Sequence, residues 1–297
     1  MASRSKQAKR RKSGGAREQR AQHAAQVLSL LEVGGYDAPS GEWVELREPI
    51  ARAVHGTELW RPEQLARALD NAPERSETHE LELSVSGEST QAAAQRLVLD
   101  EGVEELVLLN FASARNPGGG FLGGAQAQEE DLARSSALYL CLSGEGAAPY
   151  YRANRVKSTT LYTDHMIWSP QVPFFRVEGE TLLERPFRAS VITAPAPNAG
   201  PYLGRGGRRR KLEQTLRRRA GMVLALAEAQ RQRNLLLGAW GCGVFRNEPR
   251  LVADAFGQWL ESERFAGAFE RVVFAVLDPK GKTRAAFNSR FPRPGLS

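Results

Sequence analysis

One stretch, residues 110–139, constrains the fold of this 297-residue chain more than any other. It begins at the end of an apolar run at 107–109 (Val-Leu-Leu), which is typical of a buried strand. Three consecutive glycines follow at 118–120, and Gln-Glu-Glu at 128–130 then opens a helical pattern. A strand that ends in a glycine-rich loop and continues as a helix with paired carboxylates predicts a site for a phosphate-bearing ligand and for acid–base chemistry.

From residue 80 onward the sequence alternates between strand and helix patterns. We expect strands near 80–86, 104–110, 189–194, 234–240 and 271–277. We expect helices near 89–100, 127–142, 208–232, 249–262 and 282–289. The central strand patterns are continuously apolar rather than alternating, which predicts an α/β fold whose sheet is covered by helices on both faces.

The loops after the runs 104–110, 189–194 and 234–240 are rich in Gly, Pro and Asn. In open α/β sheets the ligand lies at the carboxyl ends of the strands. We therefore expect these three loops to converge on one cleft.

The basic charge of the chain is confined to its N-terminus. The net charge is +7, and residues 1–20 hold eight basic side chains and one acidic one, so the remainder is neutral. We predict a basic disordered tail over 1–16, an N-terminal helical extension over 17–79 and a core over 80–297. The tail is interpreted as a solvated terminus, with a weak contact to polyanions as the alternative. A nucleic-acid-binding protein built around the tail is disfavoured by the neutral body and by a tail without aromatic residues.

Composition excludes several classes of protein. The longest apolar runs are far below the roughly 18 residues that span a bilayer, and no apolar segment follows the basic N-terminus, so we expect neither a membrane span nor a secretory signal. The two cysteines, Cys141 and Cys242, lie far apart, and the four histidines lack metal-ligand spacing. We expect a protein of the reducing cytoplasm with no metal and no cofactor.

The adjacent glutamates Glu129 and Glu130 should point about 100° apart on a helix, so they should have separate tasks. One would face the reactive centre while the other holds a ligand hydroxyl. The alternative is a pair of acids favoured by the helix dipole, an effect of under about 1 kcal/mol. The glycines at 118–120 predict a loop of exposed N–H groups that binds anions, with a plain turn as the alternative.

Two further loops carry candidate ligand contacts. Gly-Cys-Gly-Val-Phe at 241–245 predicts a second backbone cradle, with Phe245 available to pack on a sugar or base. Cys242 has no histidine near it in sequence, which disfavours a catalytic thiol. Asn198 could donate to a ligand or cap a turn. The arginines of 205–219 are interpreted mainly as a solvated helix face, with guidance of a phosphate chain as the alternative.

The stretch NFASARNPGGGFLGGAQAQEE at 110–130 resembles the signature of bacterial-type poly(ADP-ribose) glycohydrolases, a glycine triplet followed by Gln-Glu-Glu. The likeness covers roughly residues 20–290. It continues through 133–139, 161–164, 169–173, 193–198 and 241–245. It implies a macrodomain-like mixed central sheet flanked by helices, with an added N-terminal helical part.

The resemblance also implies the reaction, which is hydrolysis of the ribose–ribose O-glycosidic bond with release of ADP-ribose. Glu130 would be the catalytic acid/base, and Glu129 would hold ribose hydroxyls. Ser113 stands where many macrodomains have Asn, and we assign it no ribose-binding role. The resemblance further implies that Asn116 bonds the distal ribose and that Phe245 packs on it. The residues that would shape the catalytic loop around this ribose are Gly118, Gly119, Gly120 and Gln128. Those that would cradle the diphosphate are Gly241, Cys242, Gly243 and Val244.

The expected partners are poly(ADP-ribose) or ADP-ribosylated macromolecules, with free ADP-ribose as the product. Two alternatives remain open. An enzyme that removes mono-ADP-ribose from protein or nucleic acid would need the same pocket. A non-catalytic ADP-ribose reader would keep the phosphate loops and lose the carboxylate, so the intact Gln-Glu-Glu argues against it.

Overall fold

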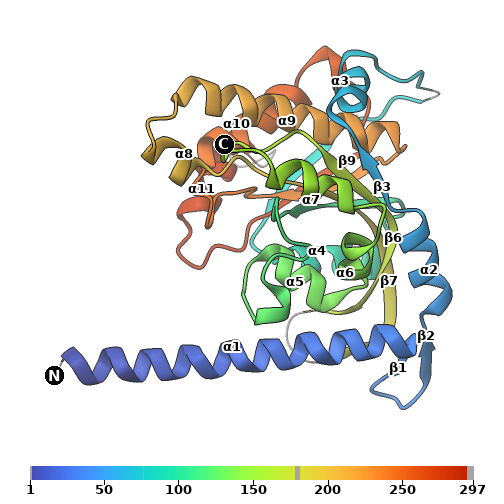
Figure 1. Cartoon of the computed structure of the whole chain (residues 1–297). Helices are drawn as coiled ribbons and strands as arrows, with labels where there is room; N and C mark the ends of the chain where they lie inside the picture. The colour runs from blue at the N-terminus through green and yellow to red at the C-terminus, as the bar shows by residue number, and fades with distance from the viewer. Residues whose placement is uncertain (1, 76, 178–180, 293–297) are drawn as a thin grey trace.

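The computed structural model describes residues 2–75, 77–177 and 181–292, and only the backbone of residues 2–14. Met1 of the expected tail, residue 76 of the expected extension, and residues 178–180 and 293–297 of the expected core lie outside the described residues. The main strands are β3 (Glu58–Trp60), β4 (Glu82–Ser86), β5 (Leu106–Phe111), β6 (Met166–Arg176), β7 (Leu182–Ala194), β8 (Asn234–Gly238) and β9 (Arg271–Ala275). They form one seven-stranded sheet in the order β3-β6-β7-β5-β8-β9-β4 (Figure 1).

The sheet is mixed. β7, β5, β8, β9 and β4 run parallel to one another, whereas β6 is antiparallel to both of its neighbours, β3 and β7. Because β7, β5 and β8 are adjacent and parallel, their carboxyl ends meet at one edge of the sheet. The predicted α/β class, with a macrodomain-like mixed sheet, is confirmed.

Helices cover both faces of the sheet (Figure 1). They are α1 (Ala2–Val33), α2 (Arg47–His55), α3 (Pro62–Asp70), α4 (Thr90–Gln95), α5 (Gln128–Ser135), α6 (Leu138–Ser143), α7 (Ala148–Arg155), α8 (Ala199–Gly204), α9 (Arg209–Ala229), α10 (Pro249–Leu260) and α11 (Lys282–Arg290). The remaining elements are a short π-helix, η1 (Arg96–Asp100), and two 3₁₀ helices, η2 (Phe121–Gly123) and η3 (Glu263–Phe265). A small hairpin pairs β1 (Gly35–Asp37) with β2 (Trp43–Glu45).

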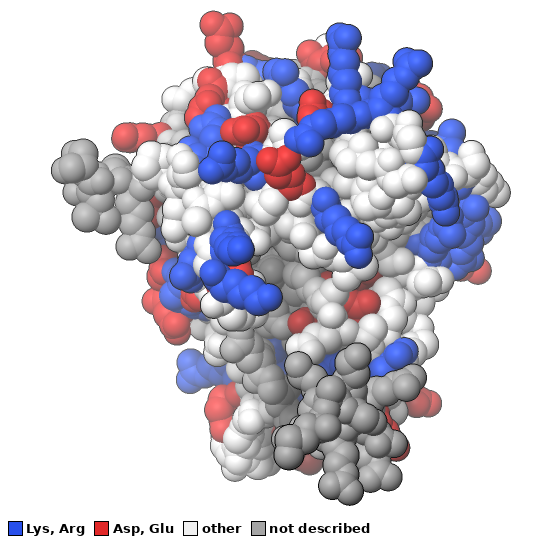
Figure 2. Space-filling model, turned by 90° about the vertical axis from the view of Figure 1, so that its left-hand side faces the viewer, with Lys and Arg blue, Asp and Glu red and all other residues white. Residues whose placement is uncertain are grey.

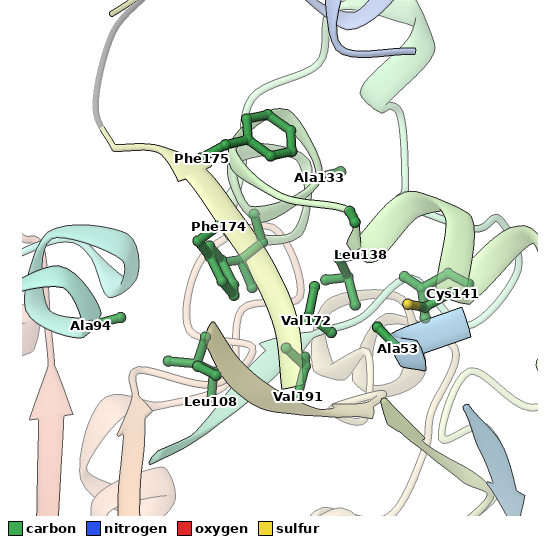
Figure 3. Packing of buried hydrophobic residues seen from close by; sticks show 14 of the residues in the cluster. Ala53, Ala94, Leu108, Ala133, Leu138, Cys141, Val172, Phe174, Phe175 and Val191 are labelled. Atoms are coloured by element: carbon green, nitrogen blue, oxygen red, sulfur yellow. The ribbon is translucent and has the colours of Figure 1, made fainter. Parts of the chain in front are cut away.

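The continuous apolar run of β5 divides its side chains between two cores. Leu106 and Leu108 join the first core, under α1, α2 and α4 to α7, whereas Val107 and Leu109 join the second, under α3 and α9 to α11. Figure 3 shows part of the first core, where Leu108 and Val191 of the sheet lie near side chains of β6. The expectation of a sheet buried on both faces is thus confirmed, and its physical cause is the pleat.

The strand β6 was not predicted. Its sequence contains Pro170 and Pro173, and proline inside a strand pattern argues against a central strand. The structure accommodates the first of them at an irregularity, because the register of β6 against β7 shifts between Ser169 and Val172. A bulge leaves a residue outside the ladder, so a missing N–H there costs no hydrogen bond.

The helix expected over 127–142 is two helices, α5 and α6. The backbone at Ser136 is extended, and this residue forms an isolated antiparallel bridge with Phe174 of β6. The Ser136 hydroxyl donates to the Leu132 carbonyl at 2.7 Å and accepts from the Leu138 N–H at 3.2 Å. The serine therefore satisfies the backbone groups that the break exposes.

The N-terminal region differs from the expected tail and extension in two ways. Residues 2–16, expected as a disordered tail, continue α1; their Lys, Arg, Ala and Gln favour a helix, whereas Gly14 and Gly15 disfavour it. The helix ends at Gly34, whose φ of +85° suits a residue without a side chain. Residues 58–60 of the expected extension form β3, an edge strand of the main sheet, so the extension is built into the core. Over the ranges described, no helix has the length and apolarity that a bilayer crossing requires.

Replacing Leu108 with alanine tests the first core. The side chain is fully buried on the central strand, so Leu108→Ala should lower the free energy of unfolding by about 3 kcal/mol, from lost burial and the cavity left behind. Urea titration measures it. Leu99→Ala, at a leucine that is 41% exposed, is the matched control and should cost under about 1 kcal/mol. Equal losses at the two sites would contradict the layered core.

Candidate active site

A cavity of about 660 Å³ opens where β5, β7 and β8 end. The three predicted loops all contribute to its wall, through Ser113 to Asn116, Ala196 and residues 241–245, so their convergence is confirmed. Figure 2 faces this side of the molecule and shows a hollow with acidic atoms inside it and Lys and Arg side chains around it. Parallel strands bring these loops together because their carboxyl ends share one edge.

Gln128, the first residue of α5, fastens this helix to β5. Its Oε1 accepts the Phe111 N–H at 2.8 Å, and its Nε2 donates to the Leu109 carbonyl at 2.8 Å and to the Thr90 hydroxyl at 3.2 Å. The side-chain amide of Gln128 thus hydrogen-bonds to the backbone groups at the end of β5. Gln128 lines the cavity, and its side chain orients α5 through bonds to the protein itself.

Glu129 is buried at 3% exposure beside the end of β5. Its Oε2 accepts the Ser113 N–H at 2.6 Å, and its Oε1 accepts from Asn110 Nδ2 at 3.4 Å. The pKa of Glu129 is raised to about 8, mainly by burial and to a smaller extent by the nearby Glu130, while the bonds from Ser113 and Asn110 lower it. Burial therefore outweighs the helix dipole, which favours the ionised form. Ser113 holds Glu129 through its backbone N–H, and the identity of its side chain in the sequence gives no sign of this contact.

Glu130 faces the glycine loop instead. Its Oε1 accepts the Gly120 N–H at 2.9 Å, and among the described residues no hydrogen bond reaches its Oε2. Gly119 has a φ of +60°, and a Cβ added there would lie 2.5 Å from Oε1 of Glu130. Glycine is therefore required at 119 by close approach as well as by backbone conformation. The two glutamates have different partners, as their angular separation predicts.

The other predicted site residues divide into two groups. Asn116 and all five residues of 241–245 line the cavity, whereas Gly118, Gly119, Gly120 and Asn198 do not. The glycines lie behind Glu130. Asn198 donates its N–H to the Thr160 carbonyl at 2.9 Å and its Nδ2 to the Tyr162 hydroxyl at 3.5 Å, so it supports the wall from outside.

The loop 241–245 is held by its neighbours. Gly241 has a φ of +71°, and a Cβ there would lie 2.5 Å from both Ala196 and Asn247. Asn247 donates to the Pro197 carbonyl at 2.8 Å and to the Gly241 carbonyl at 3.1 Å. Burial raises the pKa of Cys242 to about 12, so this thiol stays protonated and is a poor nucleophile.

Tyr162 lines the cavity and was assigned no role from the sequence. Its backbone has a φ of +61°, and its ring centroid lies 5.9 Å from that of Phe245. The tyrosine comes from a loop between α7 and β6, the strand that was missed. Other lining residues that the sequence did not single out are Glu88, Ser89, Thr90, Gln91, Phe111, Ala114, Arg115, Gln126, Ala127, Asp131, Ala196, Ala239, Ala275, Val276, Leu277, Asp278 and Thr283.

The arginines of 205–219 are mainly exposed, as expected, and Arg219 is the exception. It is fully buried, and it donates to Asp164 Oδ1 at 2.9 Å, to the Pro195 carbonyl at 2.7 Å and to the Leu161 carbonyl at 3.1 Å. These bonds satisfy the buried guanidinium. They also tie the loop that carries Tyr162 to the loop after β7.

The N-terminal helix α1 contacts the glycine-rich loop through Arg17 and Arg20, which do not line the cavity. Arg17 Nε donates to the Gly123 carbonyl at 2.8 Å, and Arg20 Nε donates to the Gly124 carbonyl at 2.9 Å. Across the part of the chain that the structure describes, no three His, Cys, Asp or Glu side chains are grouped as metal ligands would be.

A family model for the catalytic domain of microbial-type PARG matches residues 24–177, about half of the chain. The chain belongs to the microbial-type poly(ADP-ribose) glycohydrolases. The resemblance seen in the sequence is thereby confirmed, and the protein is a glycoside hydrolase of this family. The matched segment begins beyond Arg17 and Arg20.

Solved structures of such glycohydrolases are similar to most of the chain. That of poly(ADP-ribose) glycohydrolase from Thermomonospora curvata is 44% identical, with a TM-score of 0.87 over 92% of this chain and 100% of that one. Its complex with the inhibitor ADP-HPD has a TM-score of 0.85 at the same identity and coverage. The Deinococcus radiodurans enzyme in complex with ADP-ribose is 47% identical, with a TM-score of 0.76 over 81% of this chain and 96% of that one. A search of curated proteins found no significant match.

The raised pKa of Glu129 predicts a pH-dependent cost in stability. The folded protein binds this proton up to about pH 8, whereas an unfolded glutamate releases it near pH 4.5. The wild type should therefore lose stability as the pH rises through this window, by at most about 1.4 kcal/mol per pH unit from this group. Glu129→Gln removes the ionisation.

The stability of the Glu129→Gln variant relative to wild type should increase from pH 5 to pH 8 and level off above pH 8. Denaturant titrations at four or five pH values measure it. Parallel pH profiles for the two proteins would contradict a buried carboxyl with a raised pKa.

Proposed function

We propose that this glycohydrolase cleaves the ribose–ribose O-glycosidic bond of poly(ADP-ribose) and releases ADP-ribose, with Glu130 as the acid/base. The observation that carries the proposal is the hydrogen bond between Glu130 and the glycine loop, at a cavity that residues 241–245 also line. It is supported by the related enzymes, whose structures hold ADP-ribose or the inhibitor ADP-HPD.

The hydrogen bonds of the two carboxyls support the choice of Glu130 over Glu129. Both oxygens of Glu129 accept bonds from the protein, from Ser113 and Asn110. Glu130 uses one oxygen for the Gly120 N–H and, within the described ranges, leaves Oε2 without a protein donor. An acid/base needs an oxygen within reach of the substrate proton, and Oε2 meets that need.

Binding would be shared among the remaining wall residues. We assign Asn116 to the distal ribose and the backbone of 241–244 to the diphosphate, since N–H groups in glycine-rich loops bind phosphate oxygens. Phe245 would pack on the distal ribose, and Glu129 would hold ribose hydroxyls.

In the proposed reaction Glu130 donates its proton to the leaving ribose oxygen as the C–O bond breaks. Positive charge develops at the distal anomeric carbon, and the neighbouring phosphates stabilise this oxocarbenium-like centre. The carboxylate of Glu130 then takes a proton from water, whose oxygen bonds to that carbon. One carboxyl thus serves twice, unlike the two separated carboxyls of most glycosidases.

Glu130→Gln tests the assignment. The amide oxygen can still accept the Gly120 N–H, but the side chain has no proton to donate as an acid, so kcat on auto-modified poly(ADP-ribose) should fall by about 10²–10⁴-fold. The Kd for ADP-ribose should change by less than about threefold, because the binding walls are intact. Release of ADP-ribose and calorimetry measure the two quantities.

The matched control is Glu145→Gln, at an exposed glutamate outside the cavity wall, which should keep the wild-type rate. Near wild-type turnover by Glu130→Gln would contradict the proposed role. The same assay with mono-ADP-ribosylated protein distinguishes the alternatives. Faster release from that substrate would favour a mono-ADP-ribosyl hydrolase, and binding without release from either would favour a reader.

The basic residues of 1–16 are proposed as a weak contact for the polyanionic substrate. Deleting residues 1–16 removes six Lys and Arg side chains and leaves Arg17 and Arg20 in place. The dependence of log affinity for the polymer on log salt should become shallower, by up to about 4 if all six release counterions. Binding measured between about 50 and 200 mM salt tests this. An unchanged slope would leave the segment without a role in binding.

A further inference from the structure

The glycine-rich loop, residues 118–125, contacts Glu130 and is flexible by itself. Gly118, Gly119 and Gly124 all have positive φ, and glycine has the largest conformational freedom of any residue. Yet this loop supplies the Gly120 N–H that fixes one oxygen of Glu130. The position of the carboxyl therefore depends on what holds the loop from outside.

Three arginine contacts hold successive carbonyls of the loop. Arg17 and Arg20 of α1 bind the Gly123 and Gly124 carbonyls, and Arg134 of α5 binds the Ala125 carbonyl at 2.9 Å. The first two lie three residues apart, so they project from one face of the helix. Each is a charge-assisted hydrogen bond, the stronger kind.

The helix that carries Arg17 and Arg20 is itself firmly fixed. Ala24, Val27 and Leu31 are buried in the first core, so the part of α1 that follows the arginines is anchored by packing. At Gly124 the approach is so close that a Cβ would lie 2.0 Å from the Arg17 carbonyl oxygen. The backbone of α1 thus lies directly against the loop.

We propose that Arg17 and Arg20 are positioning residues for catalysis, which hold the glycine-rich loop so that the Gly120 N–H keeps Glu130 in place. Neither arginine lines the cavity, so neither contacts substrate there. Their effect passes from the carbonyls of Gly123 and Gly124 through η2 to Gly120. The inference rests on the proposed role of Glu130.

The experiment compares Arg17→Gln, Arg20→Gln and the double variant in the full chain. Each single variant should lower kcat about three- to tenfold, the equivalent of one lost hydrogen bond, and the double variant more than about tenfold. KM and the Kd for ADP-ribose should stay within about twofold, because the cavity wall is unchanged. The double Arg→Lys variant should recover part of kcat, since a lysine ammonium can still donate to a carbonyl.

Hydrogen exchange gives a second readout that does not depend on turnover. The Gly120 amide should exchange faster in the double Arg→Gln variant than in wild type, because loosening the loop breaks its bond to Glu130. Arg52→Gln, at an exposed arginine of α2, is the charge-matched control for each single variant and should change neither kcat nor exchange.

Three outcomes would overturn the proposal. A rise in KM with kcat unchanged would assign the arginines to electrostatic attraction of the polymer. A loss of thermal stability without recovery by lysine would assign them to folding alone. Unchanged exchange at Gly120 would remove the link to the loop. If Glu130→Gln stays active while the Gly120 amide still exchanges faster in the double variant, Glu130 is not the acid/base. The arginines would then still hold the glycine-rich loop.

Discussion

The hydrogen bonds of the first turn of α5 hold the active site together. Gln128 is bonded to the end of β5, Glu129 to the segment that follows it and Glu130 to the glycine loop. Three consecutive side chains thereby join three separate segments. Each bond satisfies a backbone N–H that would otherwise be unsatisfied, at a cost of about 1–3 kcal/mol where the group is buried. The cavity wall depends on this turn more than on any loop by itself.

The same turn places a carboxyl where it is costly to ionise. Glu129 is buried without a cation partner among the described residues, and its pKa is raised to about 8 as a result. A protein optimised only for stability would avoid this arrangement, and perturbed carboxyls of this kind cluster at functional sites. The helix dipole is too weak to reverse the effect of burial.

Five of the seven strands of the sheet, most helices and the convergence of three loops could be predicted, because apolar runs and glycines act locally. The strand β6 could not, because Pro170 and Pro173 obscure its pattern and its pairing with β7 is decided by distant residues. Tyr162 depends on that missed region. Arg219 reads as one more cation on a helix, since its partners lie 24 to 58 residues away in sequence. Asn116 and 241–245, which follow strand ends, reached the cavity as expected.

The burial of Arg219 has a consequence for how this enzyme can evolve. One guanidinium on α9 fixes two loops, and through them the ring of Tyr162 at the cavity wall. A mutation on this helix can therefore reshape the pocket without replacing any residue that a ligand touches. Such a mutation would change how a substrate or an inhibitor fits, although no residue of α9 lines the cavity.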